Sequence, residues 1–191
     1  MTAFVPATRR RLNARQAETV QRVTDAARAE LRAVGFDTLT VRSVASRAQV
    51  APATAYTYFS SKNHLVVELF WRRINERAGH GTALPNAVDR VVAVFDDLAQ
   101  FLAAEPELAA AATVALLGTD PDVKQLRRLI GIEINNRIAA ALDDEAPGLL
   151  DALSLAWSGA MLQAGMGYSD YARMGVRLAA ATRLIMEDHR A

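Results

Sequence analysis

Apolar residues recur at three- and four-residue intervals along nearly the whole chain, and no stretch shows the two-residue alternation of a strand. This spacing places apolar side chains along one face of an α-helix. The clearest stripes are Val20, Val23, Ala27, Leu31 and Val34, and then Val88, Val91, Val92, Phe95, Leu98 and Leu102. The pattern predicts an all-α protein of about nine helices.

Helix-starting and helix-ending residues divide the N-terminal part of this pattern. Gly35 is placed to end the first helix in a left-handed conformation. Thr40 suits the N-cap of a short helix over residues 41–48, because its hydroxyl can accept a bond from an amide that the helix leaves unpaired. Pro52 suits the first position of a second short helix, which reaches about Phe59.

The remaining segments are longer. Ser61 can cap a helix that ends in a break at residues 79–86, and Pro106 ends the stripe that begins at Val88. Residues 108–117 are almost wholly apolar, so this helix is expected to be buried on all sides. Further helices are expected at 121–142, from Pro147, and after a turn around Gly165, Gly167 and Ser169.

The two short helices are separated only by Gln49, Val50 and Ala51. Such a brief turn forces a steep crossing and leaves the second helix on the surface, where it can enter the major groove of DNA. The apolar contacts that hold the pair together are assigned to Val41, Val44, Ala45 and Val50. The spacing therefore predicts a helix-turn-helix.

A multi-position string around this motif carries a family resemblance. It consists of Gly35-Phe36, residues 39–45, Val50, Thr54, Tyr56, Tyr58-Phe59, Ser61-Lys62 and Leu65. The string resembles the signature of the tetracycline-repressor (TetR) family over about residues 14–70, while the rest agrees in length, helix content and general order. The chain departs from the family at Gln49, where glycine is usual, at Ala51, where serine is usual, and at Ala53-Thr54-Ala55, where Gly-Thr-Leu is frequent.

The resemblance implies a three-part organisation and a set of DNA contacts. We expect a flexible basic arm at 1–13, a three-helix DNA-binding domain at 14–62, and an effector-binding and dimerisation domain at 63–191. The implied phosphate contacts are Thr40, Arg42, Tyr56, Tyr58 and Lys62, and Arg42 could alternatively contact a guanine edge. The residues that would face the bases are Pro52, Ala53 and Thr54. One of the two tyrosines could instead pack against neighbouring helices, an alternative considered for Tyr56. Arg9, Arg10 and Arg11 could enter a minor groove or form a solvated tail.

The charge distribution fits a DNA-binding end joined to a non-binding body. Residues 1–77 carry 13 Lys and Arg against 6 Asp and Glu, a balance of +7, whereas residues 78–191 carry 9 against 15, a balance of −6. Chance segregation of solvated charges is the alternative. There is no cysteine, no apolar run near the roughly 18 residues of a membrane helix, and no apolar signal segment, so we expect a cytoplasmic protein.

The second half offers candidate dimer and ligand surfaces. The expected homodimer interface comprises Leu150, Leu153, Trp157, Ala160 and Ala164 on one helix and Met174, Leu178, Ala181 and Ile185 on the next. A largely apolar effector pocket is assigned to Phe70, Trp71, Phe95, Phe101, Asn135, Trp157 and Met161. For both sets the alternative is an ordinary monomer core.

These observations predict a ligand-responsive regulator. We expect a homodimer that binds an inverted-repeat operator in double-stranded DNA, represses transcription, and is released by a small apolar or amphipathic effector. The alternative is a ligand-independent DNA-binding or protein-interaction module whose second half only dimerises. No enzyme activity, metal or cofactor is expected, because the histidines are scattered and the paired glycines at 79–81 and 165–167 follow no strand.

Overall fold

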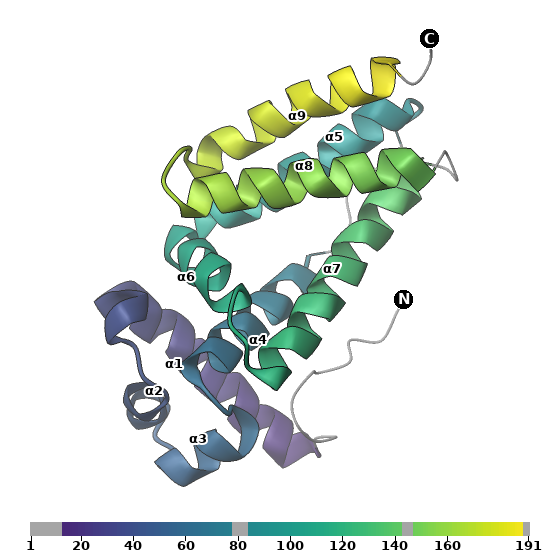
Figure 1. Ribbon diagram of the computed structural model, residues 1–191. Helices are drawn as coiled ribbons and strands as arrows, with labels where there is room; N and C mark the ends of the chain where they lie inside the picture. Colours follow the sequence, from purple (N-terminus) through teal and green to yellow (C-terminus); the bar gives the residue numbers. More distant parts are fainter. Residues whose placement is uncertain (1–12, 78–83, 143–146, 189–191) are drawn as a thin grey trace. The chain divides into compact units, whose positions relative to one another are not determined.

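The computed structural model of the chain describes residues 13–77, 84–142 and 147–188. Within these ranges the chain forms nine helices and no strand, which confirms the predicted all-α fold (Figure 1). The chain divides into two compact units. Unit 1 comprises Met1–Glu76 with Glu107–Arg128, and unit 2 comprises Arg77–Pro106 with Leu129–Ala191.

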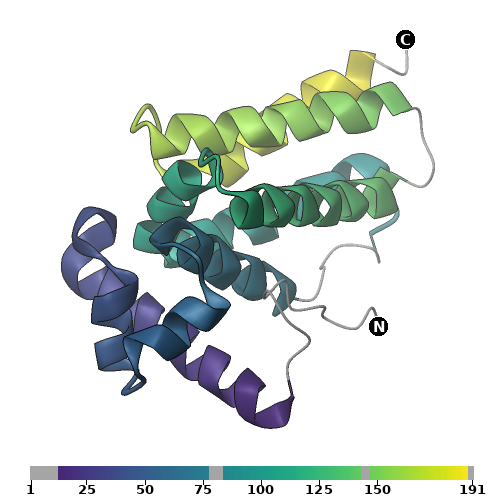
Figure 2. The same ribbon diagram turned by 60° about the horizontal axis from the view of Figure 1, so that its bottom comes forward.

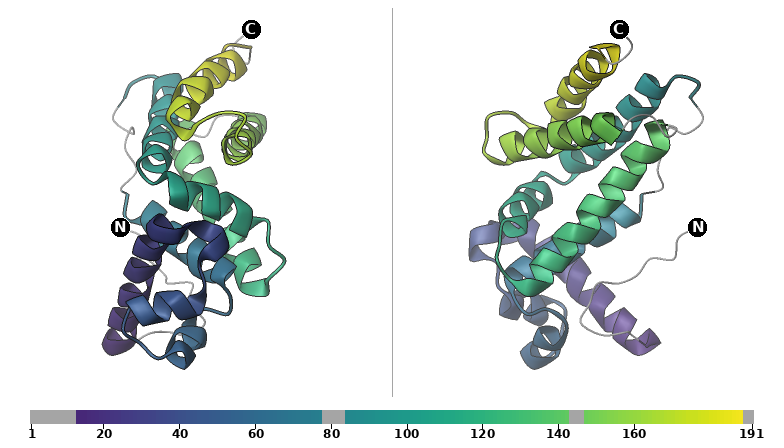
Figure 3. Two further views of the ribbon diagram at one scale, coloured as in Figure 1. Left: turned by 90° about the vertical axis from the view of Figure 1, so that its left-hand side faces the viewer. Right: turned by 45° about the vertical axis from the view of Figure 1, so that its right-hand side comes forward.

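Unit 1 contains the predicted helix-turn-helix. Its helices are α1 (Ala14–Thr38), α2 (Val41–Arg47), α3 (Pro52–Tyr58), α4 (Lys62–Asn75), α6 (Pro106–Leu116) and the beginning of α7 (Pro121–Leu142). Helices α2, α3 and α4 all pack on α1, as Figure 3 also shows. Their shared core includes the buried side chains Val20, Val23, Leu31, Leu39, Val41, Val44, Ala45, Ala55, Phe59 and Leu65.

Local chemistry accounts for the helix boundaries in unit 1. The Thr40 hydroxyl accepts from the amide of Ser43 at 3.0 Å, and the Ser61 hydroxyl accepts from the amide of His64 at 3.0 Å, so both predicted N-caps are confirmed. Gly35 has the positive φ of 73° that its predicted role requires. It produces a kink rather than an end, because the helix continues beyond it to Thr38.

Unit 2 contains α5 (Ala87–Ala104), the later part of α7, α8 (Pro147–Gly165) and α9 (Tyr171–Asp188). Helix α9 packs against both α5 and α8, and α8 and α9 run antiparallel side by side (Figures 1 and 2). The Arg90 guanidinium is buried and donates to the carbonyls of Ala141 at 2.9 Å and Leu84 at 2.9 Å. Carbonyl partners of this kind allow a cation to be buried at the end of α7.

One expectation needs adjustment. Helix α6 is not buried on all sides, since Val114 is 56% exposed and nearby Leu117 is 69% exposed. An apolar helix therefore has a solvent-facing side, which periodicity could not reveal because no polar residue marks that side. The compact unit around the helix-turn-helix contains α4 and residues 107–128 as well, while the DNA-binding domain at 14–62 stays a prediction. None of the described helices is long and apolar enough to span a membrane.

Candidate DNA-binding interface

Helices α2 and α3 form a tight pair joined by residues 48–51. The Ala48 amide donates to the carbonyl of Val44 at 2.9 Å, and the Val50 amide donates to the carbonyl of Ala45 at 3.0 Å, which closes the end of α2. Val44, Ala45 and Ala55 are fully buried, so small apolar side chains allow the two helices to approach closely. Pro52 begins α3, and Ala51 provides no side-chain cap, as its alanine side chain predicts.

Gln49 adopts a left-handed backbone conformation, with φ at 54°. A side chain in this region is disfavoured, which explains why glycine is usual here in the family that the sequence resembles. We expect Gln49→Gly to raise the free energy of unfolding by about 0.5 to 1 kcal/mol, the relief of left-handed strain less the added entropy of an unfolded glycine. Urea denaturation measures this change. Gln49→Ala keeps a Cβ and is the matched control, and an equal gain in both variants would contradict the explanation.

Four of the predicted DNA contacts lie on the surface of the pair. Thr40, Arg42, Pro52 and Ala53 are exposed, and Thr54 is half-buried. Because the Thr40 hydroxyl accepts from Ser43, its hydrogen remains available to a phosphate oxygen. Arg42 has no ionic partner within the described ranges, so its guanidinium can reach toward DNA. The structure therefore leaves these residues accessible on the surface of the α2–α3 pair.

The two tyrosines of α3 have opposite environments. Tyr56 is 48% exposed, whereas Tyr58 is only 7% exposed. The packing alternative considered for Tyr56 therefore applies to Tyr58, whose ring belongs to the core of unit 1. Residues two apart on a helix point in different directions, and tertiary packing decided which of the two faces inward. The predicted phosphate contact fits Tyr56 and not Tyr58.

Lys62 has an intramolecular role. Its ammonium donates to the carbonyls of Phe36 at 3.0 Å and Asp37 at 3.2 Å, and it lies 4.5 Å from the centroid of the Phe36 ring. A cation at these carbonyls stabilises the C-terminal end of α1. The expected phosphate contact of Lys62 would compete with these partners, so the lysine primarily joins the start of α4 to the end of α1.

Sequence reasoning missed two exposed polar residues on this surface. Thr57 is exposed on α3, where its hydroxyl donates to the carbonyl of Ala53 at 2.9 Å. Arg47 is exposed on α2 and its Nε donates to Glu30 at 2.7 Å, a hydrogen bond that lowers the pKa of the Glu30 carboxyl. The four-residue spacing from Ala53 was the signal that could have identified Thr57. Arg9, Arg10 and Arg11 lie outside the described residues.

The residues of the predicted effector pocket fall in both units. Phe70 and Trp71 belong to unit 1, and the other five belong to unit 2. Phe95 and Trp157 stack with ring centroids 6.1 Å apart, and Phe101 and Met161 are buried, which fits an ordinary core as well as a pocket wall. Asn135 does not fit the prediction, because it is exposed on α7 and accepts from the Ser154 hydroxyl at 2.8 Å.

Helix α4 also holds a buried glutamate that the sequence analysis did not consider. Glu68 is fully buried, and one of its carboxylate oxygens accepts from Arg72 Nε at 2.8 Å. Within the described residues, its other oxygen and the Trp71 indole nitrogen have no hydrogen-bond partner. Burial raises the pKa of Glu68 to about 7, although Arg72 acts in the opposite direction. The sequence signal that could have indicated this buried carboxyl is a glutamate inside an otherwise apolar stretch.

The predicted dimer rows are largely packed inside the protomer. Leu153, Trp157, Met174 and Leu178 are at most 4% exposed and Ala164 is 8% exposed, so these five have almost no surface to offer a partner. Leu150, Ala160, Ala181 and Ile185 are half-buried. The exposed apolar side chains of these two helices lie on a different face, which includes Leu155 at 66%, Leu162 at 40%, Val176 at 75% and Leu184 at 70%.

Comparison with known proteins identifies the class to which this arrangement belongs. The chain is 44% identical over 184 residues to a helix-turn-helix transcriptional regulator of Mycobacterium tuberculosis, covering 91% of this chain and 83% of the relative. It is 29% identical over 134 residues to the transcriptional repressor KstR of Rhodococcus jostii, covering 69% of this chain and 63% of that repressor. The protein is therefore a helix-turn-helix transcriptional regulator.

The family follows from the same comparisons. Residues 23–69 match the family of bacterial regulatory proteins called the tetR family. This chain belongs to the tetR family, as its sequence resemblance predicts.

Solved structures agree with this fold. A TetR regulator from Rhodococcus sp. RHA1 matches 90% of this chain and 97% of its own, with a TM-score of 0.73 and 22% identity. The FadR repressor of Thermus thermophilus, solved in complex with lauroyl-CoA, matches 88% of this chain and 93% of its own, with a TM-score of 0.68 and 20% identity.

Proposed function

We propose that the protein is a homodimeric repressor that binds an inverted-repeat operator and leaves it when an amphipathic effector binds. The observation that carries this proposal is the surface of the α2–α3 pair, where Arg42 is exposed and Tyr56 is 48% exposed. A short surface helix held by a buried apolar contact is the arrangement that enters a major groove. The relation to a named repressor supports repression as the mode of regulation.

On this proposal, different parts of the surface supply affinity and sequence choice. Pro52, Ala53 and Thr54 at the beginning of α3 would face base edges, where their small side chains favour apolar contact with thymine methyl groups and hydroxyl contacts with bases. Thr40 and Tyr56 would donate to phosphates on either side, which fixes the register of α3 in the groove. Arg42 would contact a phosphate or a guanine.

Arg42 provides the first test of the DNA contacts. Arg42→Ala is expected to weaken operator binding about tenfold, as measured by fluorescence anisotropy with a duplex selected from a random library. A phosphate contact predicts that the slope of log affinity against log salt falls by about one, while a guanine contact predicts relaxed specificity at one base pair. Arg128→Ala removes an exposed arginine from α7 and is the control. Unchanged operator affinity in Arg42→Ala would exclude Arg42 from the interface.

We propose that the dimer forms through the exposed apolar face of α8 and α9, where Ala160 and Ala181 are the members of the predicted rows that line its groove. Leu155 and Leu162 are two turns apart on α8, and Val176 and Leu184 lie on α9. A groove of about 240 Å³ between these helices is lined mainly by small side chains, including Gly159, Ala160 and Ala181, which allow a partner helix to approach closely. Two protomers joined in this way would present two recognition helices, whose spacing must be about 34–36 Å to read successive major grooves.

We propose an amphipathic effector, and acyl-CoA is the first class to test. The Thermus relative was solved with lauroyl-CoA, and α4 supplies a buried carboxylate oxygen and an indole N–H that lack protein partners within the described residues. A bound molecule with polar and apolar parts could satisfy such atoms. Lauroyl-CoA should raise the melting temperature and weaken operator binding, with CoA alone as the control. A raised melting temperature with unchanged operator affinity would favour the ligand-independent alternative.

A further inference from the structure

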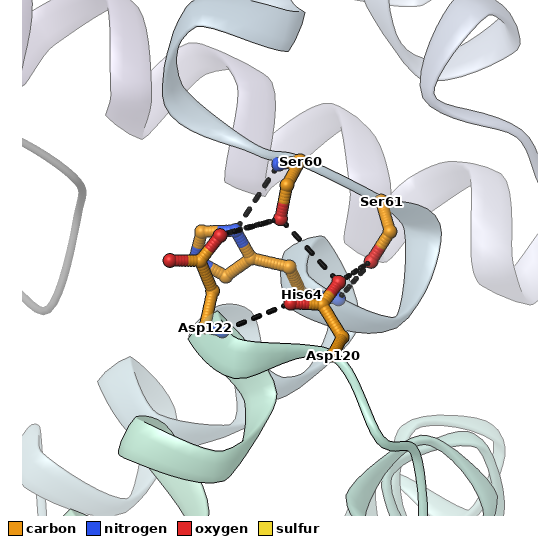
Figure 4. Close-up of polar contacts among 5 residues, drawn as sticks. All are labelled: Ser60, Ser61, His64, Asp120 and Asp122. Carbon is orange, nitrogen blue, oxygen red and sulfur yellow. Dashed lines mark hydrogen bonds and ion pairs between the residues drawn. The ribbon is translucent and has the colours of Figure 1, made fainter.

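Five polar side chains join the turn that follows α3 to the beginning of α7. They are Ser60, Ser61, His64, Asp120 and Asp122, and we call them the α3–α7 cluster (Figure 4). All five belong to unit 1, although Asp120 and Asp122 are about sixty residues away from the serines in the chain. Ser60 and Ser61 are the residues between the C-cap of α3 and the first residue of α4. The cluster therefore acts at the exit of the recognition helix.

Ser61 connects the N-termini of two helices through one hydroxyl group. Its oxygen accepts from the His64 amide at 3.0 Å, which caps α4, and its hydrogen is donated to Asp120 at 2.7 Å. Asp120 in turn accepts from the Asp122 amide at 2.9 Å at the start of α7. Burial alone would raise the pKa of Asp120, but these bonds outweigh it and hold the pKa below its usual value. The carboxylate thus stays charged and makes the strong form of hydrogen bond.

Ser60 makes the second connection. Its hydroxyl donates to Asp122 at 2.7 Å, and its amide donates to Nδ1 of His64 at 3.2 Å. His64 is fully buried, lies 3.7 Å from Asp122 through Nδ1, and packs edge-on against Phe59 with centroids 5.7 Å apart. Phe59 is the C-cap of α3. One imidazole therefore contacts the C-cap of the recognition helix, the turn after it and the start of α7.

The backbone before Asp120 is also held close to α4. A Cβ at Gly118 would lie 3.0 Å from the Ala115 carbonyl oxygen and 3.2 Å from the side-chain Nδ2 of Asn63, so a side chain is disfavoured there. Arg127 donates to the Gly118 carbonyl at 2.6 Å, which ties the connection to the first turns of α7. The α6–α7 connection is thus fixed on both sides of the cluster.

We infer that the α3–α7 cluster positions the recognition helix, with Ser60 and Asp122 as positioning residues for operator binding. The inference rests on the proposed function, in which α3 reads DNA. Apolar contacts can slide with little change in energy, whereas hydrogen bonds to a charged carboxylate fix direction and distance. Helix α7 contributes its first residues to unit 1 and the rest to unit 2. A displacement of α7 by an effector would therefore act on α3 through these two residues.

A double-mutant cycle tests the coupling between Ser60 and Asp122. Ser60→Ala and Asp122→Ala are each expected to weaken operator binding about tenfold, and the double variant should also lose about tenfold rather than a hundredfold. Asp122→Asn keeps an oxygen that accepts from Ser60 and should stay within about twofold of the unchanged protein. Gln125→Ala, at an exposed position of α7, is the control. The inference would be overturned if the double variant lost about a hundredfold in operator affinity, the product of the two single losses. It would also be overturned if both alanine variants lost less than about twofold.

A second measurement separates positioning from general stability. The chain has no cysteine, so Thr57→Cys places one spin label on α3 of each protomer. The distance distribution between the two labels should shift or broaden in Ser60→Ala and Asp122→Ala, and should be unchanged in Gln125→Ala. A lowered melting temperature with an unchanged distribution would mean that the cluster only stabilises the fold. No dipolar signal in labelled Thr57→Cys without a further substitution would instead contradict the proposed dimer.

Discussion

Replacing Leu184 by aspartate is expected to convert the dimer into monomers and to weaken operator binding on the order of 100-fold. Leu184 is 70% exposed on α9, about two turns after Val176 at 75%, and lies on the proposed dimer face. A twofold interface contains each substitution twice, so two carboxylates would have to be buried where two leucines contributed about 2 kcal/mol each. Loss of the dimer separates the two recognition helices, and the affinity gained from binding two linked half-sites is lost.

Analytical ultracentrifugation and anisotropy with the selected duplex measure the two effects. Leu117→Asp makes the same change at a leucine that is 69% exposed and belongs to unit 1, whereas α8 and α9 belong to unit 2. This control should remain dimeric. A dimer in Leu184→Asp that still binds its operator fully would show that the exposed face of α8 and α9 is not the interface.

Replacing Glu68 by glutamine is expected to make the stability of the protein less dependent on pH. The pKa of Glu68 is raised from 4.5 to about 7, chiefly because burial disfavours its charged form. At about 1.4 kcal/mol for each pKa unit, this difference corresponds to on the order of 3 kcal/mol. Glutamine has nearly the same shape and can still accept from Arg72, but it never has to be buried as an anion.

The direction of the effect follows from proton binding. Between pH 4.5 and 7 the folded protein keeps a proton on Glu68 that the unfolded chain has lost. The stabilisation from this proton is complete below pH 4.5 and disappears as the pH rises through about 7.

Urea denaturation at pH 5 and pH 8 measures the effect. Because only the unaltered chain loses the stabilising proton, the free energy of unfolding of Glu68→Gln should rise relative to that of the unaltered chain between pH 5 and pH 8. Glu18→Gln removes an exposed carboxylate from α1 and is the control. An equal pH dependence in Glu68→Gln and the unaltered chain would contradict the burial of a raised-pKa carboxyl.

The parts of the fold that depend on local chemistry could be predicted from the sequence. Thr40 and Ser61 are N-caps and Pro52 begins α3, because each effect is confined to one helical turn. The helix-turn-helix followed from the short separation of two such segments. These are interactions among neighbours in the chain, and the residue types alone specify them.

The direction in which each helix faces could not be predicted in the same way. Both α8 and α9 carry apolar residues on more than one face, so periodicity marks the helices without showing which row meets the core. The rows containing Leu153 and Leu178 pack inside the protomer, while Leu155 and Leu184 are exposed. The choice between Tyr56 and Tyr58 failed for the same reason.

Contacts between distant segments were invisible to the sequence analysis. Ser60 and Asp122 are linked at 2.7 Å although about sixty residues separate them. His64 was set aside because the three histidines are scattered along the chain. In the folded chain its Nδ1 lies 3.7 Å from Asp122 at the start of α7, and no short motif records that neighbour.

Selection of bound duplexes from a random DNA library, at two salt concentrations, tests the central claim most directly. The account predicts recovery of one inverted repeat, with half-site centres about 10 base pairs or a multiple of one helical turn apart, and binding that weakens steeply as salt rises. Recovery of no common sequence, or of a single half-site without its inverted partner, would contradict a dimer that reads DNA with α3.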